Sequence, residues 1–371
     1  MESNSTFEQH KATPEISIDN HVKLRQLELY EFVSHYKTIY LDTNFWLTLR
    51  KVALGELTDP LSKRYYDLVS LLSEQKICLF PISDSTFLEV LKQSDPVTLN
   101  ETASIIDRLS KGISLICYDD RISLETLHYL YDKTGDSTYR TNQLVWTKLS
   151  YVMGYTTPVN NVNVDLNNLI QKSFFDHMWE ISLSEMISIM RENGGVIDTS
   201  FKDISEKLNE GKFSHVNENR SFKQMFLSEL AGMIDVYKPL IQQAMFHIYK
   251  KKTGCNPSEQ EIESGENYSA TANMIYNLFK LNKITTEFPS YRITSGLHAA
   301  VRQDKNQKYQ ANDMHDFRHA SAALPYCDYF FTEGRLSHLI TQKMLSYNEL
   351  YGCCVKGNVD GAVKSLERIN D

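Results

Sequence analysis

Acidic residues stand where several apolar, β-branched stretches of this chain end. Asp42, Glu89 and Glu333 each come at, or shortly after, the end of such a stretch. Carboxylates that gather within a few ångströms repel one another unless protons or cations neutralise them. A hard divalent ion with oxygen ligands does so, and Mg²⁺ or Mn²⁺ held in this way can activate water against a phosphodiester. These residues therefore indicate a metal-dependent hydrolytic site, provided that the fold brings them together.

A second group of charged residues lies in the last quarter of the chain. Asp313 and Asp316 are three residues apart, so they share one face at the start of a predicted helix. Arg302, Lys305 and Lys308 lie just upstream, also three apart. If this segment is helical, the three cations line one face and could hold phosphates. A solvated helix surface is the alternative interpretation.

Each acid also has a purely structural interpretation. Asp42 could end a strand in a turn or cap the next helix, and Glu89 follows Thr86 in the T-x-x-E pattern of a capping box. Acids in a first helical turn are favoured by the helix dipole whatever their function. His315 and His319 have the spacing of a zinc pair, but the sequence places no third ligand beside them.

The elements that must position these acids alternate between strand and helix. Apolar runs predict strands at 38–42, 76–82, 112–118, 329–332 and near 351–356. The segments between the first three, and between the last two, repeat apolar residues at helical spacing. This alternation predicts an α/β fold with a mostly parallel central sheet covered on both faces. The ligand crevice of such a sheet lies beyond the carboxyl ends of its strands.

The pattern is interrupted between residues 119 and 300, where helical segments follow one another without convincing strands. The predicted organisation is a flexible segment at 1–22, the first part of an α/β domain at 23–118, a helical insertion at 119–300, and the second part of the domain at 301–371.

Composition narrows the classes of protein. The chain has 371 residues, of which 42% are hydrophobic and 23% charged, as in a soluble globular protein. No apolar run approaches the ~20 residues that cross a bilayer, and the N-terminus lacks the pattern of a secretory signal. We therefore expect a cytoplasmic protein without a membrane partner, with reduced cysteines. The net charge of −8 argues against binding nucleic acid over the whole surface, but not in a local, metal-loaded cleft.

Three stretches resemble the PIN domain, a family of metal-dependent nucleases that includes toxin nucleases and RNA-processing factors. They are IYLDTNFWLTL (39–49), FPISDSTFLEVL (80–91) and NDMHDFRHASAALPYCDYFFTEGRLSHLI (312–340), in the family's order. The resemblance covers roughly residues 36–118 and 295–358. It implies a three-layer α/β/α fold, and the helical insertion has no counterpart in the small members of the family.

The resemblance implies metal-ligand roles for three acids: Asp42, Glu89 and Asp316 match the family's aspartate, glutamate and aspartate positions. Asp313 matches an additional acid of some longer relatives. The expected ions are Mg²⁺ or Mn²⁺.

Two further positions follow from the same comparison. Thr332 matches the serine or threonine that ends the fourth strand, and Asn44 the polar residue after the first aspartate. The family's last acid usually stands two residues after that threonine, where this chain has Gly334. Glu333 is one residue early, which leaves open whether the fourth acidic position is functional.

The predicted function is therefore a PIN-like endoribonuclease acting on single-stranded RNA, with DNA as a less favoured substrate. The insertion is expected to select the substrate, or to bind a protein partner or a second copy of the chain. A catalytically inactive PIN-like scaffold is the alternative. An aspartyl phosphatase of the haloacid dehalogenase type ranks lower, because it needs a second aspartate two residues after the first, where this chain has Asn44.

Overall fold

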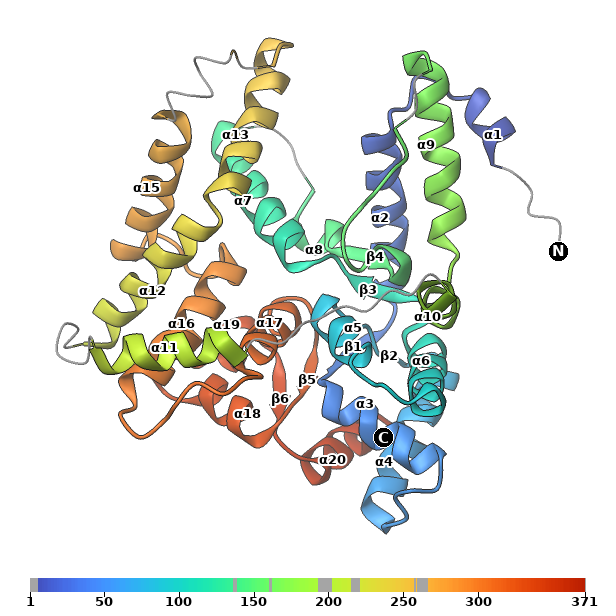
Figure 1. Ribbon diagram of the computed structural model, residues 1–371, viewed down its shortest axis with the longest axis vertical. Helices are drawn as coiled ribbons and strands as arrows, with labels where there is room; N and C mark the ends of the chain where they lie inside the picture. The colour runs from blue at the N-terminus through green and yellow to red at the C-terminus, as the bar shows by residue number, and fades with distance from the viewer. Residues whose placement is uncertain are drawn as a thin grey trace. The chain divides into compact units, whose positions relative to one another are not determined.

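The computed structural model describes residues 6–135, 139–159, 162–192, 202–214, 221–256, 258 and 266–370. The chain divides into two compact units, each built from separate segments. Unit 1 comprises Met1–Cys117, Asn142–Asp198 and Asn358–Asp371, and unit 2 comprises Tyr118–Thr141 and Thr199–Gly357. The described residues are mostly helical with short strands, which fits an α/β class at the coarse level (Figure 1).

Unit 1 contains two pairs of strands and a series of helices. Its elements are α1 (Phe7–Lys11), α2 (Ile18–Ser34), β1 (Lys37–Leu41), α3 (Thr43–Ala53), α4 (Pro60–Glu74), β2 (Cys78–Leu79), α5 (Asp84–Val90), α6 (Pro96–Ser110), β3 (Ile113–Leu115), α8 (Thr141–Leu144), β4 (Trp146–Lys148), the 3₁₀ helix η1 (Leu149–Tyr151), α9 (Val164–Trp179), α10 (Leu183–Glu192) and α20 (Val359–Asn370).

Strands β1 and β2 run parallel, as the sequence predicts. Thr38 is paired with Leu79, and the side chains of Ile39, Tyr40 and Leu41 are fully buried. A strand that is buried on both faces has a continuous apolar run, which is why the sequence pattern predicts β1 correctly.

The helix starts follow from local side-chain chemistry. Asp59 and Asp95 accept hydrogen bonds at 2.9 Å from the backbone amides of Ser62 and Thr98, so they cap α4 and α6. Proline follows each cap at the first helical position, where its missing amide proton costs nothing.

The N-terminal segment differs from the prediction of a flexible tail at 1–22. Residues 1–5 lie outside the described residues, but α1 and the start of α2 pack against α9. Asn168 of α9 accepts a hydrogen bond from the amide of Ile18 at 2.8 Å and donates one to the carbonyl of Ile16 at 2.9 Å. Lys172 donates to the carbonyl of Thr13 at 3.1 Å. The polar composition of this segment predicts flexibility, but its hydrogen-bond partners are about 150 residues away and do not appear in a local pattern.

Unit 2 joins α7 (Tyr118–Thr134) to the later part of the chain. Its other elements are α11 (Lys202–Ser214), α12 (Phe222–Val236), α13 (Lys238–Thr253), α15 (Glu266–Lys280), α16 (Pro289–Gln303), α17 (Asp313–Ala323), β5 (Tyr329–Phe331), α18 (Gly334–Thr341), α19 (Tyr347–Tyr351) and β6 (Cys354–Lys356). Strands β5 and β6 are parallel, with Phe330 opposite Val355.

A buried carboxylate ties two helices of unit 2 together. Glu125 of α7 accepts hydrogen bonds from the amide and the hydroxyl of Ser290 at the start of α16, and from the hydroxyl of Tyr326. Around it, α7, α12, α13, α15 and α16 share one apolar core that includes Ile122, Leu230 and Phe279.

The predicted insertion at 119–300 is not a single helical domain. Residues 142–198 belong to unit 1, and they include β4, which pairs antiparallel with β3, Ser114 opposite Thr147. The third predicted strand therefore joins an antiparallel pair, with one parallel bridge between Ile82 and Ser114. The sequence pattern missed β4 because its run of alternating residues is only three residues long.

Among the described residues, no helix combines the length and the apolar character needed to span a bilayer.

Candidate functional site

Asp42 comes directly after β1, at the position that precedes α3. Its side chain is 4% exposed, and its backbone is extended, as expected of an N-cap residue. The carboxylate nevertheless makes no capping hydrogen bond to α3. The expectation that the side chain of Asp42 caps α3 is therefore wrong, although the residue occupies the N-cap position.

Glu89 lies beside Asp42. Their oxygen atoms are within 4.8 Å of one another, and Thr43 donates a hydrogen bond of 2.5 Å from its hydroxyl to Oε2 of Glu89. Helix α5 begins after Ser83, so Glu89 occupies its last turn and the predicted capping box with Thr86 does not form.

Thr86 contributes instead to a buried hydroxyl cluster with Tyr40 and Ser83. The hydroxyl of Tyr40 in β1 lies 2.6 Å from that of Ser83 and 3.1 Å from that of Thr86. These bonds join β1 to α5 and so hold Asp42 and Glu89 near each other. Asn44, two residues after Asp42, is exposed.

The pair of Asp42 and Glu89 has the donor chemistry of a site for a hard divalent cation. Two carboxylates at this separation repel each other when both are charged, and a cation between them removes that repulsion. Carboxylate oxygens favour Mg²⁺ or Mn²⁺ over ions that prefer sulfur.

The acids of unit 2 have different environments. Asp313 is fully buried and forms an ion pair with Arg335, and its Oδ2 also accepts the amide of Gln310 at 2.9 Å. This carboxylate is already neutralised by the chain, so its predicted role as a metal ligand has no support from its surroundings. Asp316, one turn along α17, is partly exposed.

Thr332 and Glu333 follow β5. Thr332 is buried, and its amide donates to the carbonyl of Lys356, which extends the pairing of β5 with β6. Glu333 is exposed at the N-cap position of α18 and makes no capping hydrogen bond.

The three predicted phosphate-binding cations do not share a helical face. Helix α16 ends at Gln303, so Lys305 and Lys308 lie beyond it in non-helical backbone, where both are exposed. Arg302 is the last cation of α16 and forms an ion pair with Glu229 of α12. The prediction of one basic helical face is wrong, because the helix stops before its second member.

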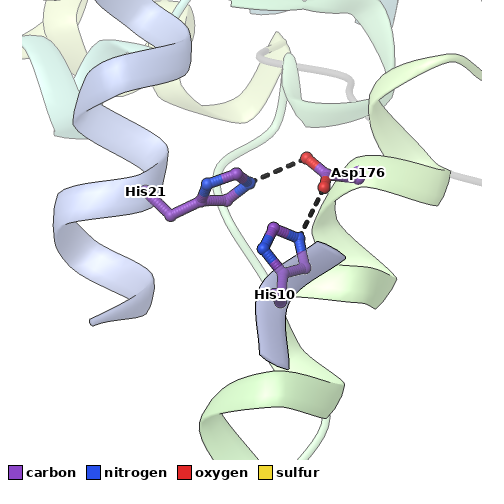
Figure 2. A group of neighbouring side chains, drawn as sticks. All are labelled: His10, His21 and Asp176. Atoms are coloured by element: carbon purple, nitrogen blue, oxygen red, sulfur yellow. Dashed lines mark hydrogen bonds and ion pairs between the residues drawn. The ribbon is translucent and has the colours of Figure 1, made fainter. Parts of the chain in front are cut away.

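A cluster that the sequence did not reveal lies in unit 1. His10 of α1 and His21 of α2 both direct Nε2 at the carboxylate of Asp176 in α9, at 2.7 and 2.8 Å (Figure 2). The two imidazole rings lie edge to face, with centroids 4.8 Å apart. No local spacing could have identified the three residues, since Asp176 is 166 and 155 positions from its partners.

The groups of this cluster shift one another's protonation. Burial lowers the pKa of His10, although its hydrogen bond and charge interaction with Asp176 act in the opposite direction. Burial alone would raise the pKa of Asp176, but the hydrogen bonds and charges of His21 and His10 outweigh it, and the pKa of that carboxyl group lies below its usual range.

Comparisons of this chain with protein-family models, with curated proteins and with solved structures found no match.

Proposed function

We propose that this chain is a PIN-like, divalent-metal-dependent endoribonuclease that cleaves single-stranded RNA. The observation that carries the proposal is the pair of Asp42 and Glu89, whose oxygens lie within 4.8 Å of one another where β1 ends. Two carboxylates at this separation repel each other when both are charged, and a bound divalent cation would remove that repulsion.

Asp42 and Glu89 would hold the ion, and Thr43 orients Glu89 through its hydrogen bond. A bound Mg²⁺ or Mn²⁺ supplies an activated water and neutralises charge on the scissile phosphate. The PIN resemblance also assigns a ligand role to Asp316 and a water-positioning role to Thr332.

Substrate contacts are assigned to the exposed side chains of Asn44, Lys305 and Lys308. Lysines of this kind attract the phosphate backbone without reading sequence. We assign neither a substrate contact to Arg302 nor a metal-ligand role to Asp313, because each forms an ion pair within unit 2.

The test is cleavage of end-labelled single-stranded RNA by the purified chain with Mn²⁺ or Mg²⁺. Asp42→Asn and Glu89→Gln are expected to lower the rate about 100-fold or more, because each removes an ion-binding carboxylate. EDTA should abolish cleavage. Glu74→Gln, which changes an exposed acid at the end of α4, is the matched control and should retain the full rate.

Asp316→Asn is tested separately, because the PIN resemblance alone assigns its role. Cleavage that survives unchanged in Asp42→Asn would contradict the proposal. An unmodified chain that neither cleaves RNA nor binds Mn²⁺ by calorimetry would favour the alternative function, a catalytically inactive scaffold.

A further inference from the structure

The cluster of His10, His21 and Asp176 gathers three potential metal donors from three different helices of unit 1. Nε2 of each histidine and an oxygen of the carboxylate all lie within 4.8 Å of one another. The cluster is enclosed: the side chains of His10, His21 and Asp176 are 10%, 14% and 14% exposed. Figure 2 shows that both rings point their nitrogens at the same carboxylate.

The donor set selects the kind of ion. Two imidazole nitrogens and one carboxylate oxygen suit Zn²⁺ and related first-row ions, whereas Mg²⁺ and Ca²⁺ prefer oxygen alone. Ligands at zinc bond lengths in a tetrahedral arrangement lie about 3.3 Å apart. Donor atoms already within 4.8 Å of one another therefore need to approach by roughly 1.5 Å or less, which side-chain rotations can supply.

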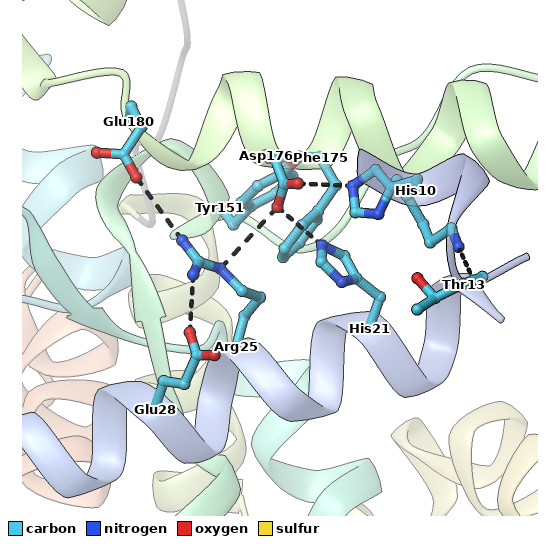
Figure 3. Close-up of polar contacts among 10 residues, drawn as sticks. His10, Thr13, His21, Arg25, Glu28, Tyr151, Phe175, Asp176 and Glu180 are labelled. Atoms are coloured by element: carbon cyan, nitrogen blue, oxygen red, sulfur yellow. Dashed lines mark hydrogen bonds and ion pairs between the residues drawn. The ribbon is translucent and has the colours of Figure 1, made fainter. Parts of the chain in front are cut away.

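The charged side chains around the cluster favour binding of a cation. Arg25 approaches Asp176, with Nε 3.9 Å from Oδ1, but it also pairs with Glu28 at 2.7 Å and Glu180 at 3.7 Å (Figure 3). The buried Lys172 donates to a backbone carbonyl rather than to Asp176. The group thus contains three carboxylates, those of Asp176, Glu28 and Glu180. It contains two cations, Arg25 and Lys172, so with neutral imidazoles its net charge is negative.

Aromatic rings pack against His21 on one side of the cluster. The ring of His21 lies edge-on to Phe175, with centroids 5.6 Å apart, and Phe175 stacks on Tyr151 at 4.8 Å. Rings packed in this way fix the orientation of His21 and exclude water, and both effects strengthen metal binding.

We propose that His10, His21 and Asp176 form a site for a transition-metal ion of the Zn²⁺ class that fastens α1 and α2 to α9. Three protein ligands leave one tetrahedral position for water. Because α1 has only five residues and forms no other side-chain hydrogen bond to α9 among the described contacts, the ion would be a main anchor of the N-terminal segment. This site is independent of the acids proposed for RNA cleavage.

The experiment is a Co²⁺ titration of the full-length, tag-free, metal-stripped chain, followed by visible absorption and by competition with Zn²⁺. A polyhistidine tag must be absent because it binds the same ions. We expect one tetrahedral Co²⁺ per chain, seen as an absorption band that Zn²⁺ displaces. Asp176→Asn and His21→Ala should weaken Co²⁺ binding by about 100-fold or more.

Controls separate this site from others. His177→Ala removes an exposed histidine next to Asp176 and should keep the band, and the Asp42→Asn, Glu89→Gln double variant should keep it too. Zn²⁺ should raise the melting temperature of the unmodified chain and not that of Asp176→Asn. The absence of a band, or equal Co²⁺ affinity in Asp176→Asn and the unmodified chain, would overturn the proposal and leave the cluster as hydrogen bonds alone.

Discussion

At the scale of single residues, buried carboxylates in this chain differ in what compensates their charge. Arg335 compensates Asp313 directly, whereas Asp42 has Glu89, a second acid, as its neighbour. Glu125 is held by neutral hydroxyl and amide donors. The proposed role in metal binding therefore excludes Asp313, whose charge Arg335 already neutralises, and rests on the short separation of the carboxylates of Asp42 and Glu89.

Glu125 provides a prediction on pH and stability. Burial raises its pKa to about 7, despite opposing hydrogen bonds from Ser290, while an unfolded chain has the ordinary value of 4.5. The folded state therefore binds more protons between these values, and the stabilisation is full below pH 4.5 and lost as the pH rises through 7. We expect the free energy of unfolding of unit 2 to fall between pH 5 and 8.

Chemical denaturation across this range measures the effect. Glu125→Gln keeps the size of the side chain and one acceptor oxygen but does not titrate, so its stability should depend less on pH than that of the unmodified chain. The same slope in both proteins would show that Glu125 is not the responsible group.

At the scale of elements, local caps decide where the helices that carry functional residues begin. Asn163 has an extended backbone and accepts the amide of Leu166 at 2.8 Å, so it caps α9, the helix that carries Asp176. Asn163→Ala should lower the free energy of unfolding by about 1 kcal/mol, while Asn163→Asp retains an acceptor and should change it little. Equal losses in the two variants, measured by urea denaturation, would contradict the assignment of this cap.

The strand β1 and the helix α3 after it illustrate what local pattern can predict. The apolar run before Asp42 and the helical spacing of Phe45, Trp46 and Leu49 located both elements. The capping-box pattern at Thr86 predicts a later start for α5 than the structure has, because the helix begins after Ser83. Hydroxyl bonds between Thr86 and Tyr40 are tertiary contacts, which a local pattern does not contain.

At the scale of the whole molecule, each compact unit is assembled from segments that are distant in the sequence. The C-terminal helix α20 belongs to unit 1 and packs on α4, with Ala362 and Leu366 fully buried. Leu366→Ala should therefore destabilise unit 1 by about 2–5 kcal/mol through lost burial and a new cavity.

Thermal denaturation followed by circular dichroism tests this prediction. Glu367→Gln is the neighbouring control: it removes an exposed ion pair with Arg64 at 3.1 Å, and exposed pairs contribute little. A melting temperature that falls no further in Leu366→Ala than in this control would show that α20 does not stabilise the unit.

The sequence by itself determined the α/β alternation, the parallel pairing of its first two strands, and the acids Asp42 and Glu89 as candidate ligands. Hydrophobic periodicity and strand ends act over a few neighbouring residues, so a linear pattern records them. Only the tertiary structure decided that Arg335 neutralises Asp313, that Glu229 pairs with Arg302, and that two N-terminal histidines meet Asp176. Those contacts join residues from 22 to 166 positions apart, and burial and hydrogen bonding across such separations depend on how the whole chain packs.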